Sequence, residues 1–556
     1  MKKAWYKEGV VYQIYPRSFN DSNNDGIGDI PGIIEKLDYI ASLGANIIWL
    51  SPIYASPLDD NGYDISDYKA IHPDYGTMDD FKTLLSECHK RGLKLIMDLV
   101  VNHTSDEHKW FIESRKSVDN PYRDYYIWRK PSKKGFPNNW KSFFGGDAWK
   151  LDEATNEYYL HLFSPKQPDL NWDNPKVREE VKDILRFWLD LGIDGFRCDV
   201  INIISKCEGL PNGKFDLLLT GKEKYLNGPN IFKYLGEIRD EVFSNYDMFT
   251  VGEGCFITTN DAINYESGDN PYLNMMFMFD HMNCDSILVK WFVKKFKPKN
   301  LKKAMRKWQY EVNGKGWNTL YFENHDQPRS ISRFGSETHR IESGKMLATY
   351  LYFMQGTPFI YQGQEIGMTN PHYKKLEEYE DVESRNIYNI GRKSFGFSHK
   401  FMMKRIEIMS RDNARTMMQW DDSDNGGFSK VTPWYSVNSN YKEINVKKDL
   451  ESNDSLIKYY QEIIKLRNKH EVIVYGDYKE YFPNSNKLAC YTRTLGEESI
   501  MVLINFTNKN LKINLKKLPF DVKKGKEILN SINKKIDGTL LPYQAIVFHF
   551  PEKYEN

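Results

Sequence analysis

The stretch Gly195-Phe196-Arg197-Cys198-Asp199-Val200 is the most informative one for the fold of this chain, because a short apolar run ends there in charged residues. Three other stretches repeat the pattern: Asp98-Leu99-Val100-Val101-Asn102-His103, Val251-Gly252-Glu253 and Phe322-Glu323-Asn324-His325-Asp326. A carboxylate is costly to bury unless it is paired or faces a pocket. Polar residues at the carboxyl ends of parallel barrel strands face one common site.

Eight apolar runs alternate with helical stretches along the chain. The predicted strands are Val11–Tyr15, Asn46–Leu50, Leu93–Val101, Gly195–Ile201, Met248–Glu253, Phe277–His281, Thr319–Asn324 and Pro358–Gln362. The helical stretches include Ile30–Leu43, Met78–Arg91, Pro175–Leu191, Gly228–Phe243 and Glu342–Gln355. This alternation predicts an α/β fold, a parallel sheet closed into a (β/α)8 TIM barrel.

Two connections are too long for a simple strand–helix unit. Residues 104–174 are rich in Trp, Tyr and Gly and predict an inserted subdomain after the third strand, while 365–445 predict a loop-rich excursion. The catalytic barrel is expected at 1–103 and 175–477. Short alternating runs within 478–556 predict a C-terminal antiparallel β-domain.

The composition excludes several kinds of partner. The 556 residues carry 77 Lys and Arg against 76 Asp and Glu, a net charge of +1, which argues against binding to nucleic acid. No apolar stretch is long enough to span a membrane, and none of signal-peptide length precedes Glu8. The six cysteines, without a CxxC pair, predict reduced thiols. We expect a cytoplasmic monomer.

The four stretches bring together three acids, an arginine and two histidines. Cleavage of a glycosidic bond needs one carboxyl acid to protonate the leaving oxygen and one carboxylate to attack or stabilise the sugar carbon. Each segment alone is better explained by a structural ion pair or a solvated loop. At the ends of the third, fourth, fifth and seventh strands of one barrel, they together predict a glycosidase.

These segments resemble the conserved regions of glycoside hydrolase family 13, the α-amylase family, over essentially the whole chain. Residues 167–172 (QPDLNW), 324–329 (NHDQPR) and 410–416 (SRDNART) resemble its oligo-1,6-glucosidase and α-glucosidase branch. The resemblance implies Asp199 as nucleophile, Glu253 as general acid/base and Asp326 as transition-state stabiliser. It also implies retention of anomeric configuration, with about 5–5.5 Å between the carboxyls of Asp199 and Glu253.

Residue spacing supports the division of roles. Arg197 and Asp199 lie two apart on a strand and so point to one face, where the guanidinium is expected to keep Asp199 ionised. Glu253 has no basic neighbour in sequence, which favours the raised pKa of an acid catalyst.

The resemblance further implies which residues hold the non-reducing glucose. Asp60 and Arg411 are expected to bond its hydroxyls and make the enzyme exo-acting, and Tyr63 to stack on the ring. Ordinary loop structure is the alternative for each residue. The complete substrate-binding set is Asp60, Tyr63, His103, Phe163, Gln167, Arg197, Val200, His325 and Arg411, of which Phe163 and Gln167 come from the inserted subdomain.

Val200, next to the expected nucleophile, bears on linkage specificity. In the family branch, Val at this position accompanies α-1,6 cleavage, whereas Ala or Thr accompanies α-1,4 cleaving or isomerising members; barrel packing is the plain alternative. The following loop, Gly254 to Thr259, departs from most relatives and leaves the second subsite open. We therefore expect an oligo-1,6-glucosidase acting on isomaltose and short isomalto-oligosaccharides. The alternatives are sucrose, trehalose 6-phosphate or α-1,4 substrates, and, more remotely, an inactive binding relative.

The stretch Asp21-Ser22-Asn23-Asn24-Asp25-Gly26-Ile27-Gly28-Asp29 is the metal candidate, because oxygen ligands at alternate positions suit a hard cation. It is no EF-hand, since Gly32 stands where the bidentate Glu belongs. The resemblance implies structural Ca²⁺, or Mg²⁺, and an acidic turn without metal is the alternative. The implied ligands are Asp21, Asn23, Asp25, the carbonyl of Ile27, and Asp29; no organic cofactor is expected.

Overall fold

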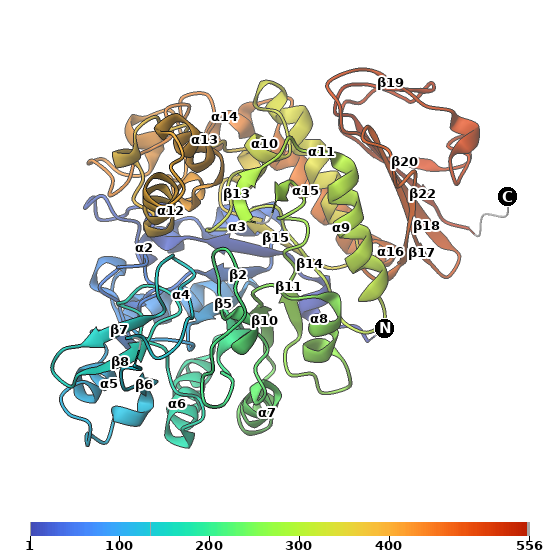
Figure 1. The fold of residues 1–556 in the computed structure, drawn as a ribbon. Helices are drawn as coiled ribbons and strands as arrows, with labels where there is room; N and C mark the ends of the chain where they lie inside the picture. The colour runs from blue at the N-terminus through green and yellow to red at the C-terminus, as the bar shows by residue number, and fades with distance from the viewer. Residues whose placement is uncertain (1, 134, 288, 553–556) are drawn as a thin grey trace.

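Eight parallel strands form a ring at the centre of the molecule (Figure 1). The structure is a computed structural model that describes residues 2–133, 135–287 and 289–552. The strands are β1 (Val11–Ile14), β2 (Ile47–Leu50), β5 (Lys94–Leu99), β9 (Gly195–Cys198), β10 (Phe249–Glu253), β11 (Met275–Phe277), β14 (Thr319–Leu320) and β15 (Thr357–Tyr361). They pair in the order β11-β10-β9-β5-β2-β1-β15-β14, and a parallel bridge between Met276 and Asn318 joins the two ends. The predicted TIM barrel is confirmed.

All eight strands differ from their predicted bounds by at least one residue, and the sixth and seventh differ most. The sixth lies at Met275–Phe277 rather than Phe277–His281, because the chain leaves the sheet after Phe277. The His281 side chain instead contacts the carbonyl of Tyr321 at 2.7 Å, which lies just beyond β14. The seventh strand accordingly ends at Leu320, four residues before the predicted end.

Helices surround the ring. They are α2 (Ile30–Glu35), α3 (Leu37–Leu43), α4 (Met78–Lys90), α6 (Pro175–Leu191), α7 (Ile231–Glu241), α8 (Thr259–Glu266), α9 (Pro298–Glu311), α11 (Arg340–Tyr352) and α15 (Leu456–Lys469). The predicted helix Ile30–Leu43 is divided at Lys36 into α2 and α3. Among the described residues, none of the helices has the length and apolar character needed to cross a bilayer.

Helix α6 shows how local sequence sets the bounds of a barrel helix. The Asn174 side chain accepts a hydrogen bond from the amide of Lys176, and Pro175 occupies the first helical position. The helix stops at Gly192, whose φ of +105° lies in the left-handed region. Its buried residues Val177, Val181, Leu185 and Trp188 recur every three or four positions and so form one face against the barrel.

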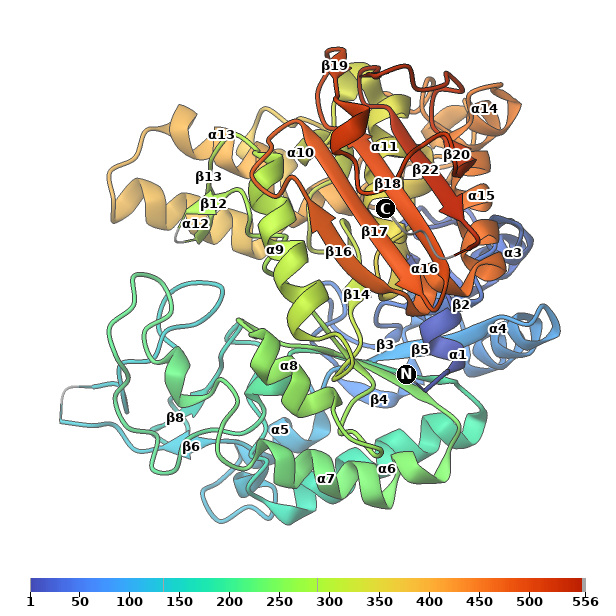
Figure 2. The same ribbon diagram turned by 90° about the vertical axis from the view of Figure 1, so that its right-hand side faces the viewer.

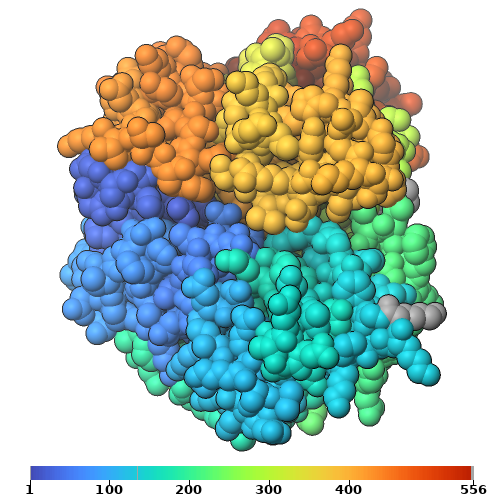
Figure 3. All heavy atoms as spheres, turned by 60° about the vertical axis from the view of Figure 1, so that its left-hand side comes forward, coloured from blue at the N-terminus to red at the C-terminus, as the bar shows by residue number. Residues whose placement is uncertain are grey.

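Two excursions cover the same end of the barrel. The first contains α5 (Lys109–Ser114) and an antiparallel sheet of β6 (Trp128–Arg129), β8 (Glu157–Leu160) and β7 (Trp149–Asp152). The second contains α12 (Val382–Lys393) and α13 (His399–Met409), besides irregular segments. Figure 3 shows the two meeting along a seam, and the Asn386 side chain there donates to the carbonyl of Phe144 (3.0 Å).

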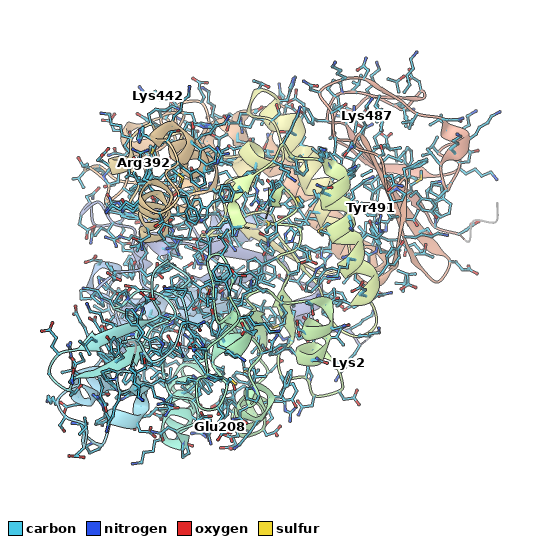
Figure 4. All side chains as sticks on the ribbon, in the orientation of Figure 1. Lys2, Glu208, Arg392, Lys442, Lys487 and Tyr491 are labelled. Carbon is cyan, nitrogen blue, oxygen red and sulfur yellow. The ribbon has the colours of Figure 1, made fainter. Side chains whose placement is uncertain are left out.

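An antiparallel sheet at the C-terminal end packs against the barrel. Its strands, seen face-on in Figure 2, are β16 (Asp477–Tyr481), β17 (Leu488–Leu495), β18 (Glu498–Asn505), β22 (Ala545–Phe550) and β20 (Lys526–Asn530). A separate pair joins β19 (Leu511–Lys512) to β21 (Thr539–Leu540). Tyr491 of β17, labelled in Figure 4, points toward the barrel and donates to the carbonyl of Tyr350 (2.9 Å). The predicted C-terminal β-sheet is thus present.

Candidate active site

A single buried guanidinium, that of Arg197 at the end of β9, contacts three carboxylates. Its Nη1 donates to Asp98 and to Asp199 (2.7 Å), and its Nη2 donates to Glu253 (2.5 Å). Asp98 lies on β5, Asp199 directly follows β9 and Glu253 ends β10, so three neighbouring strands supply the acids. They meet at the carboxyl ends of the strands, where TIM-barrel active sites form.

The pKa of Asp199 differs from the expectation drawn from the sequence. Burial raises the pKa of the Asp199 carboxyl well above its ordinary value. The Arg197 guanidinium opposes this shift, but the carboxylates of Glu253 and Asp98 and a hydrogen bond with Glu253 reinforce it. Arg197 divides its single charge among three acids, so it offsets only part of the shift.

Glu253 has partners in space that its sequence neighbours do not indicate. Besides Arg197, the amide of Val200 donates to Glu253 Oε2 at 3.4 Å. Val200 has φ +37° and ψ +38°, a left-handed conformation that a β-branched residue rarely adopts. Such strain persists only where the surrounding structure enforces it, and it often marks functional sites. The strained turn directs the Val200 amide toward Glu253, while its side chain joins an apolar cluster with Phe163 and Cys255.

Asp326 has a different electrostatic environment from Asp199. Its carboxylate lies 2.8 Å from Nη2 of Arg415, 3.5 Å from Nη1 of Arg411 and 3.2 Å from Nε2 of His325. Although desolvation opposes it, these cationic and hydrogen-bonding neighbours hold the pKa of Asp326 well below its ordinary value. Asp326 is therefore ionised at neutral pH, and its pKa is shifted in the opposite direction from that of Asp199.

The structure also brings together the predicted sugar-binding residues of the first subsite. Asp60 accepts from Arg411 Nη2 (3.1 Å) and from Gln167 Nε2 (3.2 Å). Gln167 Nε2 lies 3.3 Å from Nε2 of His103, and the His103 ring lies 5.1 Å from the ring of Phe163. Burial lowers the pKa of His103 to about 4, so its imidazole is neutral at physiological pH. These contacts join residues from the barrel and from both excursions into one cluster.

Tyr63 connects this cluster to the carboxylates. Its hydroxyl contacts Nε2 of His325 at 2.7 Å and donates to Asp98 at 3.3 Å. Nδ1 of His325 contacts the side-chain amide of Gln13 at 2.8 Å. The rings of Tyr63 and His325 are stacked and nearly parallel, with 7° between their planes. All twelve catalytic and substrate-binding residues predicted from the sequence therefore lie within a single contact network.

Four further charged residues contact this network and were not predicted as site residues: Asp98, Asp381, Glu383 and Arg415. Asp98 and Arg415 stand inside the quoted motifs, so their proximity to named residues was an available signal. Asp381 carries no comparable signal: it caps the start of α12 in the second excursion, is fully buried and accepts from Nε of Arg411 at 2.8 Å. Although burial opposes it, Arg411 holds the pKa of Asp381 below its ordinary value.

The candidate metal loop forms a compact turn. Asp21 accepts from the amides of Asn24 (2.7 Å) and Gly26 (2.8 Å), and Asp25 accepts from the amide of Ile27 (2.8 Å). Burial raises the pKa of Asp29, whose carboxylate accepts from Ser22 and from the amide of Gly32. In the part of the chain that the structure describes, Asp21, Asp25 and Asp29 do not bring three carboxylate oxygens within 4.8 Å of one another. The donors are oxygens that suit a hard cation, and they face backbone amides.

A TIM barrel whose mouth gathers carboxylates from separate strands around buried arginines has the groups that cleavage of a glycosidic bond requires. The alpha-amylase family model (alpha amylase, catalytic domain) matches residues 13–476. The chain belongs to this family of glycoside hydrolases.

Similar proteins have closely related sequences over nearly their whole length. An oligo-1,6-glucosidase of Parageobacillus thermoglucosidasius is 57% identical over 515 residues, 92% of each chain. An oligo-1,6-glucosidase of Bacillus cereus is 53% identical over 559 residues, 99% of this chain and 100% of the other. The crystal structure of Bacillus licheniformis trehalose-6-phosphate hydrolase superposes with a TM-score of 0.93 at 45% identity, covering 99% of this chain and all of that one.

Proposed function

We propose that this protein is a retaining, exo-acting oligo-1,6-glucosidase that releases glucose from the non-reducing end of isomaltose and short isomalto-oligosaccharides. The observation that carries the proposal is the placement of Asp199 and Glu253 on the two terminal nitrogens of one buried Arg197, with Val200 beside them. The identity of 53–57% to oligo-1,6-glucosidases supports the α-1,6 linkage over the alternatives.

In the first step, the carboxylate of Asp199 attacks the anomeric carbon while Glu253 donates a proton to the leaving oxygen. The C–O bond to the aglycone breaks as the bond to Asp199 forms. In the second step, Glu253 accepts a proton from water, which attacks the same carbon and releases Asp199. The chemistry requires Asp199 to be ionised and Glu253 to carry a proton when sugar is bound. A leaving oxygen beside Glu253 favours that state, because it accepts a hydrogen bond from the protonated carboxyl.

Asp326 is proposed to stabilise the transition state. Positive charge develops on the sugar carbon and ring oxygen as the glycosidic bond breaks. A carboxylate that is already ionised and held by Arg415 and Arg411 needs no proton transfer and little reorganisation to interact with that charge. The depressed pKa of Asp326 keeps it in this state across the neutral range.

Exo action is proposed to follow from the ion pair between Asp60 and Arg411. This pair joins the second barrel loop to the segment after α13, and Arg411 also lies 5.1 Å from the ring of Phe144 in the inserted subdomain. A terminal glucose would bond to both charged groups through its hydroxyls. A chain extending beyond that glucose would have to displace the pair, so internal bonds are not expected to be cleaved.

The test is hydrolysis of isomaltose, maltose, sucrose and trehalose 6-phosphate at equal concentration, with the anomer of the released glucose followed by NMR. The proposal predicts the highest kcat/KM for isomaltose and initial release of the α-anomer. Faster turnover of maltose or trehalose 6-phosphate would reassign the substrate, and initial release of the β-anomer would exclude the retaining mechanism. The predicted carboxyl separation of about 5–5.5 Å is measurable in a crystal with a bound inhibitor.

We also propose that the loop from Asp21 to Asp29 holds a structural Ca²⁺, or Mg²⁺. The chemistry of the donor set supports this, because Asp21, Asn23, Asp25, the Ile27 carbonyl and Asp29 offer only oxygen. A cation would also stabilise the ionised carboxylate of Asp29 and so oppose the effect of burial, which raises its pKa. When bound, the ion would brace the first barrel loop. Dialysis against a chelator should release one equivalent and lower the melting temperature; no bound metal and unchanged melting would reject the site.

We propose further that the protein acts as a cytoplasmic monomer. All six cysteines are free thiols, and Cys88, Cys198 and Cys490 are buried, which suits a reducing compartment. Size-exclusion chromatography with light scattering tests the monomer directly, with an expected mass of 65.5 kDa. A mass of twice this value would exclude it.

A further inference from the structure

Three side chains far apart in the sequence meet where the last barrel helix joins the C-terminal sheet. His470 lies between α15 and α16 (Glu471–Tyr475), Glu498 begins β18, and His549 lies on β22. Figure 2 shows α16 beside the ends of β18 and β22. The metal-ligating atoms of the three residues all lie within 4.8 Å of one another. None of the three belongs to the active-site network.

The distances between the side-chain atoms of this group are similar to the distances between ligand atoms around a metal ion. Oε1 of Glu498 lies 2.7 Å from Nε2 of His549 and 3.1 Å from Nδ1 of His470. Ligands at 2.0–2.2 Å in a tetrahedral zinc site lie about 3.3 Å apart. Small side-chain rotations would therefore convert the hydrogen-bonded group into a coordination group.

The surroundings favour a bound cation. The two imidazoles are mostly buried, with 11% and 13% of their side chains exposed, while Glu498 is 29% exposed and open to ion entry. Both rings approach the same carboxylate oxygen, and their centroids lie 4.5 Å apart.

We propose that His470, Glu498 and His549 bind a divalent transition-metal ion, with Zn²⁺ as the expected chemistry. Two imidazole nitrogens and one carboxylate oxygen are typical of Zn²⁺, and hard cations such as Ca²⁺ prefer oxygen alone. A water molecule would complete the tetrahedron. The ion would bridge the segment between α15 and α16 to β18 and β22, and so fasten the C-terminal sheet to the barrel. It takes no part in glycoside cleavage.

The experiment is equilibrium dialysis of the chelator-treated full chain against Zn²⁺, with bound metal measured by elemental analysis. The wild type should bind one equivalent of Zn²⁺. In H549Q and in E498Q the affinity for Zn²⁺ should fall by more than about 100-fold, because loss of a residue that only hydrogen-bonds a metal ligand already costs about 10–100-fold. H399Q is the matched control, because His399 is exposed and pairs with Tyr388 instead. Saturating Zn²⁺ should raise the melting temperature of the wild type and of H399Q but not of H549Q or E498Q.

Two results would overturn the assignment. One is the absence of stoichiometric Zn²⁺ binding to the wild type. The other is equal binding by wild type, H549Q and E498Q, which would place the ion elsewhere. Replacement of Zn²⁺ by Co²⁺ gives a readout that does not depend on protein stability. The visible absorption of Co²⁺ reports tetrahedral ligation by nitrogen and oxygen, and it should be present in the wild type and absent in H549Q and E498Q.

Discussion

Replacement of Val200 tests the α-1,6 preference most directly. Its side chain is 6% exposed and packs with Phe163 and Cys255, immediately after the proposed nucleophile. Val200→Ala removes two methyl groups from this wall, whereas Val200→Thr keeps the branched shape and adds a hydroxyl. A contact of this size in an apolar pocket is worth about 1–3 kcal/mol, or about 10–200-fold in kcat/KM. We expect the ratio of kcat/KM for isomaltose to that for maltose to fall at least about tenfold in Val200→Ala and less in Val200→Thr.

Folding should not obscure this measurement. Removing the two buried methyl groups costs about 0.8 kcal/mol each. The left-handed φ of +37° is less strained for Ala than for a β-branched residue, which offsets part of that cost. Initial rates on both disaccharides, together with melting curves, separate specificity from stability. Ratios within twofold of the wild type in both variants would reduce Val200 to barrel packing and direct attention to the loop from Gly254 to Thr259.

Two other predictions concern the carboxyls. Asp199→Asn and Glu253→Gln should each lower kcat by at least about 10³-fold with little change in melting temperature, and residual activity near that of the wild type in either variant would refute the assigned roles. Burial raises the pKa of Glu266 from its ordinary value of 4.5 to about 8, so the free energy of unfolding is highest below about pH 4.5 and falls as the pH rises to about 8. The whole shift corresponds to about 5 kcal/mol, of which about 3 kcal/mol falls between pH 6 and pH 9. Urea unfolding at these two pH values should show a fall in stability that Glu266→Gln lacks; equal falls would exclude Glu266 as its source.

The barrel was predictable from sequence because its strands are buried on both faces. Strand β2, Ile47–Leu50, is apolar and buried at each position, which produces a continuous signal. The short strands β11 and β14 were misplaced because their bounds depend on pairing with neighbours rather than on their own residues. Strands β16 and β20, at the two edges of the C-terminal sheet, have a weak sequence signal because charged residues interrupt their apolar pattern.

The candidate site was predictable where a motif named the residue, as for Asp199, Glu253 and Asp326. The raised pKa of Asp199 was not predictable. It depends on burial and on nearby carboxylates, including Asp98, which no sequence rule places against the same arginine. Asp381 was missed for a similar reason, since its contact with Arg411 depends on how the second excursion folds over the barrel. Local pattern thus identifies which groups are present, and tertiary packing sets their charge.

An excess of carboxyl groups over arginines gives the mouth its electrostatic character. Three arginines (Arg197, Arg411 and Arg415) pair with seven carboxyl groups: Asp60, Asp98, Asp199, Glu253, Asp326, Asp381 and Glu383. Glu383 has a separate partner in Lys290, yet the remaining six acids still outnumber the three arginines. With these acids ionised, the formal charge of the mouth is negative before substrate arrives. Because the transition state of glycoside cleavage is positive at the sugar carbon, this imbalance is relieved as the bond breaks, so it favours the transition state over the neutral sugar.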